Sequence, residues 1–416
     1  MSTQTLEFTK RDIKILRDLA RRVADIAALP IQQQKAEMWR QHNDLNRIRP
    51  MVLIFPEGSW RELLPRSVLQ CEGPRAQDYE YDLRVRLYYA EHLPDDNVIE
   101  PYIPSPIVMR RTGWGLEGQV TRPDDPLGAY HIDCAVQSEA DLERLQIPTV
   151  TVDWDETESL YRTLQEVFDS VLIVEKQGQG NYGLAPLDHY AQLRGIDRMF
   201  MDLVENPQMV HRAISRIVDG HIALVKSMEQ QGALTLGNRR HYVGSGGTGF
   251  THQLPQAGFD GRVRTCDLWG FATAQIFSEV SPTMHEEFAL RHEARALELF
   301  GLNCYGCCEP LHHKLDRIKR CIPRLRRVSI SPWADVERSA AELADKYIFS
   351  WKPNPAIVAS ERWNPQAARR IIRDFLQKTR GCIVEMIMKD THTCRNKPQR
   401  MWDWVRIAKE EAEAFA

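Results

Sequence analysis

The residues best suited to chemistry are gathered at 301–313, "GLNCYGCCEPLHH", which holds three cysteines, a glutamate and two histidines. Thiolates, imidazoles and carboxylates are ligands of zinc, and a thiolate is also a nucleophile. Cys304 and Cys307 form a C-x-x-C, but no second pair follows at zinc-ribbon spacing, which argues against a closed structural zinc. A catalytic zinc, a reactive thiol and thiols that only pack remain as interpretations.

A regular series of elements would position these residues. Short apolar runs predict eight buried strands, at 51–55, 171–174, 241–243, 263–269, 299–305, 327–331, 347–351 and 382–388. Amphipathic stretches predict helices between most of them, at 196–231, 283–299, 311–320, 335–345 and 364–379. Apolar strands that alternate with helices indicate an α/β fold with a parallel sheet buried on both faces. Eight units favour a (β/α)8 TIM barrel over an open sheet, and no nucleotide-binding glycine motif follows any strand.

The remaining segments predict two additions to the barrel. Residues 8–46 carry a helical pattern that Pro30 interrupts, so 1–48 is predicted to be an N-terminal helical extension and 49–416 the barrel. Residues 71–150 fit no alternation of strand and helix, which predicts an insertion with a small sheet of its own that could act as a lid.

Composition limits the kinds of partner. The chain has 54 basic and 57 acidic residues without a long basic run, which argues against nucleic acid. No apolar run approaches the roughly 20 residues that span a bilayer, and the N-terminus lacks a signal-peptide layout, so we expect a cytoplasmic protein with no membrane partner. Nine cysteines, an odd number, are expected to be reduced.

In a barrel, catalytic groups lie at the carboxyl ends of the strands. Charged groups there are costly to bury without a partner, so their concentration predicts a ligand pocket. The tryptophans among them, with Trp351, suit a flat or apolar ligand. The residues at the predicted strand ends are Glu57, Ser59, Trp60, Glu175, Lys176, Ser245, Asp267, Trp269, Tyr305, Cys307, Cys308, Glu309, Ser331, Trp333, Lys352, Asn354, Lys389, Asp390 and His392.

Zinc is one candidate cofactor of such a pocket. Its predicted ligands are Cys307, Cys308, Glu309 and Cys394, with His392 nearby. The competing interpretation is structural: the thiols pack, and Lys352 and Lys389 form ion pairs with Glu175 or Asp390. His312 and His313, at the start of a predicted helix, are common solvated positions.

Five segments resemble the uroporphyrinogen decarboxylase-like superfamily: "VLIFPEGSW", "CDLWGFATAQIFSEVSP", "NCYGCCEPLHHKLDRIKR", "RVSISPWADVERSAAELADKYIFSWKPNP" and "VEMIMKDTHTCRNKPQRMWDWVRIAKE". The resemblance covers 165–416 well, and it implies a (β/α)8 barrel. The decarboxylases have an arginine motif where this chain has "FPEGSWREL", so the cobalamin-dependent methyltransferases are the closer branch. Their zinc site uses a His-x-Cys pair and a later Cys; here Tyr305 replaces the His if Cys307 is the matching Cys, and Cys308 is the alternative register.

The resemblance implies that a methyl group is taken from a small methylated substrate, such as an aryl methyl ether, and passed to the cobalt of a corrinoid protein. The implied partners are a corrinoid protein and a small methyl donor, and a homodimer is left open. A decarboxylase or lyase of a small carboxylate and a non-catalytic corrinoid- or ligand-binding barrel are the alternatives. The predicted catalytic residues are Glu57, Tyr305, Lys389, Asp390 and His392, and the predicted substrate-binding residues are Trp60, Glu175, Asp267, Trp269, Ser331, Trp333, Lys352 and Asn354.

Overall fold

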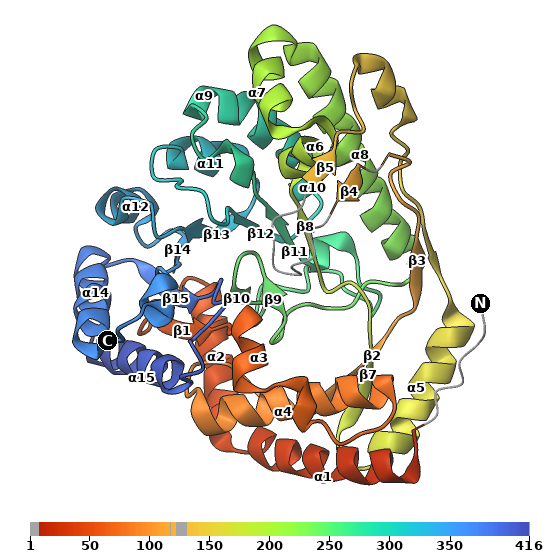
Figure 1. The fold of residues 1–416 in the computed structure, drawn as a ribbon, viewed down its shortest axis with the longest axis vertical. Helices are drawn as coiled ribbons and strands as arrows, with labels where there is room; N and C mark the ends of the chain where they lie inside the picture. The colour runs from red at the N-terminus through yellow and green to blue at the C-terminus, as the bar shows by residue number, and fades with distance from the viewer. Residues whose placement is uncertain (1–7, 117, 122–130, 416) are drawn as a thin grey trace.

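A seven-stranded parallel sheet forms the centre of the molecule in the computed structural model, which describes residues 8–116, 118–121 and 131–415. The strand order is β1-β15-β14-β13-β12-β11-β8, and each neighbouring pair is parallel (Figure 1). The strands are β1 (Met51–Ile54), β8 (Asn181–Leu184), β11 (Trp269–Ala272), β12 (Leu302–Tyr305), β13 (Leu325–Ile330), β14 (Ile348–Trp351) and β15 (Ile383–Met388). The prediction of an α/β fold around a parallel sheet is confirmed.

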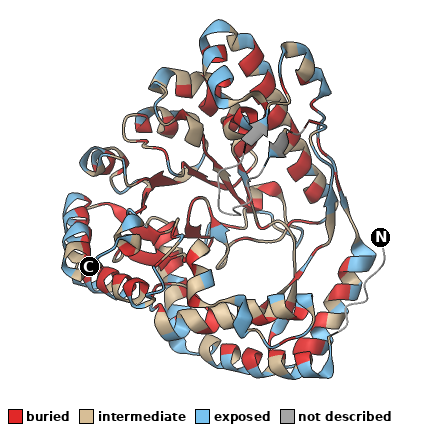
Figure 2. Cartoon of the chain, in the orientation of Figure 1, coloured by how far each residue is buried: buried red, intermediate tan, exposed pale blue. Residues whose placement is uncertain are grey.

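Helices surround this sheet. Their sheet-facing sides are buried and their outer sides are exposed, as the amphipathic pattern predicts (Figure 2). They are α1 (Lys10–Ala27), α2 (Pro30–Asn43), α3 (Trp60–Leu63), α4 (Pro74–His92), α5 (Trp154–Phe168), α6 (Pro186–Arg194), α7 (Ile196–Glu205), α8 (Pro207–Gln230), α9 (Pro282–His285), α10 (Arg291–Leu297), α11 (Leu315–Cys321), α12 (Val336–Leu343), α13 (Ala356–Ala359), α14 (Pro365–Lys378) and α15 (Gln399–Ala414).

The strand predicted at 171–174 is displaced. It becomes β7 (Ile173–Gln177), which pairs in parallel with β2 (Tyr102–Pro106) instead of joining the seven-stranded sheet. The chain continues from β7 into β8, which pairs with β11. The sequence of β8, "NYGL", holds no apolar run, so its place in the sheet could not be predicted from hydropathy.

The strand predicted at 241–243 is wrong as a member of the central sheet. Tyr242–Val243 (β9) pairs antiparallel with Gly247–Thr248 (β10), and this hairpin packs over one face of the sheet, hereafter the hairpin face. A Cβ atom at Gly244 would lie 2.7 Å from Cys304 Cβ, and one at Gly247 would lie 2.1 Å from Arg327 Cζ. The glycine run "GSGGTG" therefore allows close packing.

The N-terminal extension contributes to the core. Leu16, Leu19, Ala20 and Val23 of α1 are buried and Ile13 is partly buried, so one face of this helix packs against the core. At the end of α2, the Asn43 Nδ2 donates to the carbonyl oxygens of Thr248 (3.0 Å) and Phe250 (2.6 Å). The end of α2 is thus hydrogen-bonded to the hairpin and to the segment after it. The domain boundary at residue 48 stays a prediction.

The predicted insertion at 71–150 holds short strands. β3 (Met109–Arg111) pairs with β6 (Val150–Val152), and β4 (Gln119–Thr121) pairs with β5 (His131–Asp133). The same stretch also contains α4, which packs against α1, and β2, which pairs in parallel with β7. Residues 117 and 122–130 lie outside the described residues.

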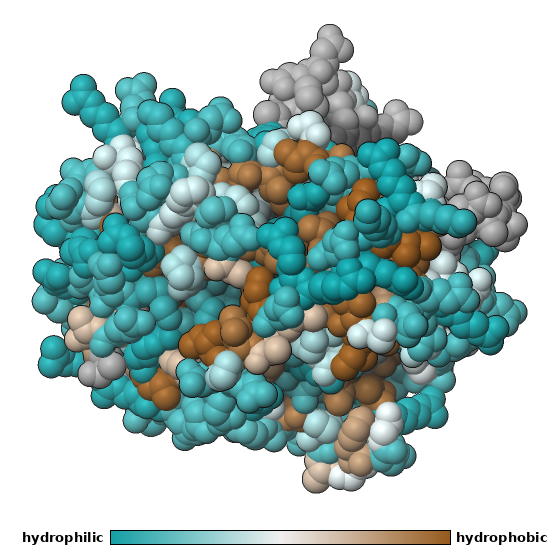
Figure 3. Space-filling model, turned by 90° about the horizontal axis from the view of Figure 1, so that it is seen from below, coloured by the Kyte–Doolittle hydropathy of each residue, from teal (hydrophilic) through white to brown (hydrophobic). Residues whose placement is uncertain are grey.

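Figure 3 shows the molecule from below, with apolar groups in the middle of this face and hydrophilic residues around them. Among the described helices, none combines the length and the apolar character needed to cross a bilayer.

Candidate active site at the strand ends

Polar side chains project from the hairpin face in a column along two neighbouring strands. Because side chains alternate between the faces of a strand, Glu385 and Ile387 of β15 share a face with Lys389, and Ser350 of β14 shares a face with Lys352. Both lysines directly follow the carboxyl ends of their strands. On this face, the buried carboxylate of Glu385 is therefore followed, at the strand ends, by the amines of Lys389 and Lys352.

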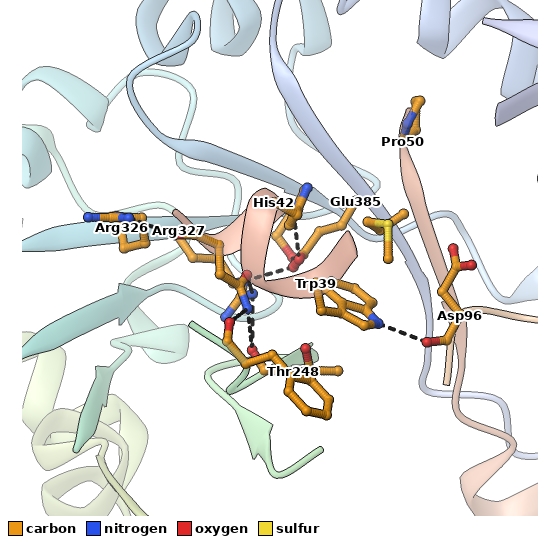
Figure 4. Close-up of polar contacts among 12 residues, drawn as sticks. Trp39, His42, Pro50, Asp96, Thr248, Arg326, Arg327 and Glu385 are labelled. Carbon is orange, nitrogen blue, oxygen red and sulfur yellow. Dashed lines mark hydrogen bonds and ion pairs between the residues drawn. The ribbon is translucent and has the colours of Figure 1, made fainter. Parts of the chain in front are cut away.

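A buried ion cluster forms the lower part of this column. Arg327 Nε lies 2.9 Å from Glu385 Oε1, and His42 Nε2 lies 3.2 Å from Glu385 Oε2 (Figure 4). Ser350 also donates to Glu385. Burial opposes ionisation of Glu385, but the charge of Arg327 and the contact with His42 hold its pKa well below the usual value. The cluster therefore keeps a carboxylate charged in the core.

Lys352 links the cluster to the strand ends. Its Nζ donates to Ser350 Oγ (2.6 Å) and to the Ser350 carbonyl oxygen (3.1 Å), and only 4% of the residue is exposed. Burial lowers the pKa of Lys352 to about 7, against the opposing charge of Glu385. This amine can therefore exchange a proton near neutral pH.

The thiol of Cys307 occupies the centre of the site. Ser245, in the loop of the hairpin, donates to Cys307 Sγ at 3.3 Å, and Lys389 Nζ lies 3.9 Å from the same sulfur. The Cys308 sulfur lies 3.5 Å away. The hydrogen bond from Cys308 and the charge of Lys389 lower the pKa of Cys307 to about 6, although burial opposes ionisation. Cys307 thus has the environment of a reactive thiolate.

The loop that carries Cys307 is fixed by buried polar groups. Glu309 Oε2 accepts from the Cys307 backbone N–H at 2.9 Å, and Thr273 donates to Glu309 Oε1 at 2.8 Å. Ser329 donates to the Cys307 carbonyl oxygen at 2.9 Å. The Glu309 carboxylate therefore supports the loop from within the protein.

Glu57 and Asp390 meet at the rim. Both adopt left-handed backbones, with φ of +44° and +57°, which non-glycine residues rarely do outside functional sites and tight turns. Burial and the like charge of Asp390 raise the pKa of Glu57. Asp390 Oδ1 in turn lies 3.6 Å from Lys389 Nζ. The predicted catalytic residues Glu57, Lys389 and Asp390 are thus brought together with Cys307 and Cys308.

A cavity of about 690 Å³ adjoins the strand ends through Phe55 and Tyr242, and neither Cys307, Lys352 nor Lys389 is among its lining residues. Phe55 and Tyr242 line it, and their rings are 5.0 Å apart at an angle of 74°. Tyr242 is also close enough to Lys389 to raise the pKa of that amine, against the effect of burial. Glu175 lines the same cavity and pairs with Arg239 at 2.9 Å. Tyr242 is therefore the residue through which this cavity, which Glu175 also lines, meets Lys389.

Two predicted substrate residues lie at the wrong end of their strand. Asp267 and Trp269 were expected after a strand at 263–269, but β11 begins at Trp269, so both stand at its amino end. Asp267 pairs with Arg264 at 2.9 Å in the preceding turn, and Trp269 Nε1 donates to the Gly249 carbonyl oxygen at 3.0 Å. Both residues therefore have packing roles.

Tyr305, predicted to be catalytic, points away from the site. It follows Cys304 on β12 and so faces the helices. Its hydroxyl donates to Glu293 Oε2 at 2.9 Å and lies 2.8 Å from His285 Nε2. Burial raises the pKa of Tyr305 well above its usual value. This arrangement is a buried polar contact between strand and helices.

Of the four predicted zinc ligands, Cys307 and Cys308 are in contact, but the other two have different partners. The Cys394 thiol is buried and donates to Glu62 Oε2 at 3.0 Å, while Glu309 is engaged with its own loop. Among the described residues, no group of three or more His, Cys, Asp and Glu side chains is arranged to hold a metal. The donors in their present arrangement therefore do not fit zinc.

The other predicted residues lie around the site or outside it. Ser331 is buried after β13. His392 is exposed and lies against Gly58, since a Cβ atom added at Gly58 would be 3.1 Å from the His392 Cα. Trp333 is 70% exposed, and Trp60 packs edge-on against Tyr88. Two more support helices: Trp351 stacks on Phe375 of α14, and Asn354 Oδ1 accepts from the Ala356 N–H of α13.

Residue-level reasoning missed Glu385, Ser350, Arg327, Tyr242 and Thr273 as parts of this arrangement. Glu385 and Ser350 carry a detectable signal, because each is the polar residue of an otherwise apolar strand, whereas Arg327 shares β13 with Arg326 and Ser329 and does not stand out. Tyr242 and Thr273 carry none, since their positions depend on the hairpin and on the true end of β11.

The chain matches no family model, and no curated protein matches its sequence.

Proposed function

We propose that this chain transfers a methyl group from a small methylated compound, such as an aryl methyl ether, to the cobalt of a partner corrinoid protein. The observation that carries the proposal is the meeting of Lys389, Lys352 and the Cys307 thiol at the strand ends. Demethylation leaves negative charge on the departing atom, and fixed positive charge in a partly buried site stabilises it.

The proposed fold is a closed (β/α)8 barrel of the uroporphyrinogen decarboxylase-like superfamily. β1, β2, β7 with β8, and β11 to β15 supply eight parallel strands, and only β1 and β2 lack a mutual ladder among the described residues. The segment before β2 bridges that gap: the Asp96 N–H donates to the Val52 carbonyl oxygen at 2.8 Å, and Asp95 Oδ2 accepts from the Ile54 N–H at 3.1 Å. These contacts support closure.

The two lysines have different parts in the proposed reaction. Lys389 stays protonated, because Tyr242, Cys307 and Asp390 outweigh burial and raise its pKa, so it supplies fixed charge to the leaving atom. Lys352, with its pKa lowered to about 7 by burial, is the group that can release a proton to that atom. The Cys307 thiolate holds the Lys389 ammonium in place.

A bound corrinoid supplies a strongly nucleophilic cobalt to receive the methyl group. The residues of this chain bind the donor in the 690 Å³ cavity and direct its leaving atom to Lys389. Phe55 and Tyr242, which line the cavity, suit a flat donor. The exposed rim at Glu57 and Cys308 is the side on which the partner would approach. Zinc has no part in the proposed reaction.

A decarboxylase or lyase is the second candidate, because the interacting amines of Lys352 and Lys389 at neighbouring strand ends could also hold a carboxylate. Release of carbon dioxide from a small carboxylate without corrinoid would identify it.

The proposal is tested with purified protein, reduced cobalamin and a panel of methoxylated aromatic compounds, methylamines and methyl thioethers. Methylation of the cobalamin is read from its absorption spectrum. We expect turnover with at least one donor, loss of at least tenfold in rate in Lys389→Gln, and no change in Lys378→Gln, whose lysine pairs with Asp374 on the surface of α14. A chain that methylates no corrinoid with any donor, but binds donor or corrinoid, would be a binding protein.

A further inference from the structure

Cys307 and Cys308 are the only two thiols in hydrogen-bonding contact within the part of the chain that the structure describes, which includes all nine cysteines. Their sulfur atoms lie 3.5 Å apart although the residues are adjacent in sequence. A disulfide needs about 2.0 Å between sulfur atoms, so the two must approach further. Adjacent Cα atoms are about 3.8 Å apart, below the usual range for a disulfide of about 4.4–6.8 Å, so a bond between these neighbours is strained and readily reduced. Both sulfurs point toward the same rim, because Cys307 faces Lys389 and Cys308 faces Asp390 at 3.9 Å.

The two thiols differ in the way that a nucleophile and a resolving thiol differ. Cys307 is the more readily ionised of the pair, since Ser245 and Lys389 stabilise its thiolate. Cys308 is the exposed thiol, which a small molecule can reach. The nucleophilic Cys307 therefore lies next to the solvent-exposed Cys308.

The two residues also differ in the hydrogen bonds that hold their backbones. Cys307 is held through its N–H by Glu309 and through its carbonyl oxygen by Ser329. Within the described residues Cys308 makes no backbone hydrogen bond. Pairing would thus move Cys308 toward a fixed Cys307.

We propose that Cys307 and Cys308 form a redox-active pair, which a small-molecule disulfide oxidises to a disulfide between neighbouring residues. The Cys307 thiolate attacks one sulfur of the small disulfide, forms a mixed disulfide and releases one thiolate. Cys308 then gives its proton to solvent and attacks the Cys307 sulfur, releasing the second thiolate. The cysteine pair loses two electrons, and the small disulfide gains them as two thiols.

Oxidation removes the Cys307 thiolate from beside Lys389. The oxidation state of the two cysteines would therefore regulate the reaction at this site. The inference does not depend on methyl transfer, because exchange requires only the two thiols and their surroundings.

The test treats the reduced full-length protein with oxidised glutathione, then denatures it in N-ethylmaleimide and digests it with trypsin. The peptide of residues 296–314 carries Cys304 as well as the pair. We expect it to lack two hydrogen atoms and to carry one maleimide group, on Cys304. Cys308→Ser should stop at a glutathione adduct on Cys307, and Cys307→Ser should react at least tenfold more slowly.

Cys304→Ala is the matched control, since Cys304 is buried beside Arg327 and belongs to the same peptide. It should still form the disulfide. The proposal is overturned if wild-type protein keeps both thiols of the pair alkylated, if the adduct on Cys307 is not resolved, or if Cys304→Ala abolishes the bond. Failure of methyl transfer alone leaves each of these outcomes unchanged.

Discussion

The Cys307 sulfur lies 3.9 Å from the Lys389 Nζ, so a thiol from the end of β12 faces an amine from the end of β15. Each favours the charged form of the other, which lowers the pKa of Cys307 and raises that of Lys389. Two strands that are far apart in the chain order thus create one polar centre.

The reactivity of Cys307 follows from this contact. We expect its alkylation by iodoacetamide to rise with pH with a midpoint near 6, because the thiolate is the reacting form. Lys389→Gln should move the midpoint upward. Cys266, whose pKa is raised by burial and by Asp267, is the internal control and should react only at alkaline pH. A common midpoint for Cys307 and Cys266 would contradict the assignment.

Removal of the buried carboxylate should weaken the fold. Glu385→Gln leaves Arg327 without its partner in the core, and breaking a buried ion pair costs about 3–5 kcal/mol. Urea unfolding measures the loss. Glu410→Gln, which breaks exposed pairs with Arg369 and Arg406, should cost less than about 1 kcal/mol. Equal losses in the two variants would show that the cluster is not important for stability.

The Glu385 carboxylate also makes the free energy of unfolding depend on pH. The pKa of Glu385 is lower in the folded protein than in the unfolded chain, so its contribution is fully present above the unfolded value of about 4.3 and is lost as pH falls toward the folded value. Unfolding free energies of wild-type and Glu385→Gln protein should therefore converge as the pH is lowered below about 4. Parallel curves would contradict this linkage.

The glycine hairpin should tolerate no side chain at its closest approach. In Gly247→Ala, the added Cβ would lie 2.1 Å from Arg327 Cζ, and overpacking of a core typically costs about 1–3 kcal/mol. Thermal unfolding should show the loss. Gly261→Ala has open space around the new methyl group and isolates the cost of a backbone with φ of +101°. An unchanged melting temperature in Gly247→Ala would mean that the hairpin can move away.

The sequence was sufficient to predict the regular part of the fold. Strands at 51–55, 299–305, 327–331, 347–351 and 382–388 all lie in the central sheet, because buried parallel strands are apolar along their length. Hydropathy failed where position depends on tertiary packing. The run at 241–243 resembles a strand, but the glycines that follow it make a hairpin, and β8 joins the sheet without an apolar run.

The candidate site was predictable to the extent that strand ends were. Glu57, Lys352, Lys389 and Asp390 follow correctly placed strands and do meet there. Asp267 fails because the end of β11 was misplaced, and Tyr305 fails because a one-residue change reverses the face of a strand. Cys394 could not be placed from the sequence, because its partner Glu62 comes from α3, 332 residues earlier in the chain.

Methyl transfer from a series of aryl methyl ethers to reduced cobalamin is the most direct test of the proposed function. If Lys389 stabilises the leaving oxygen, the rate loss in Lys389→Gln should grow as that oxygen becomes more basic, and should be small for the least basic member. Lys378→Gln should follow wild-type protein throughout. A rate loss of equal size across the series would contradict the proposed role of Lys389, and no methyl transfer from any donor would contradict the function itself.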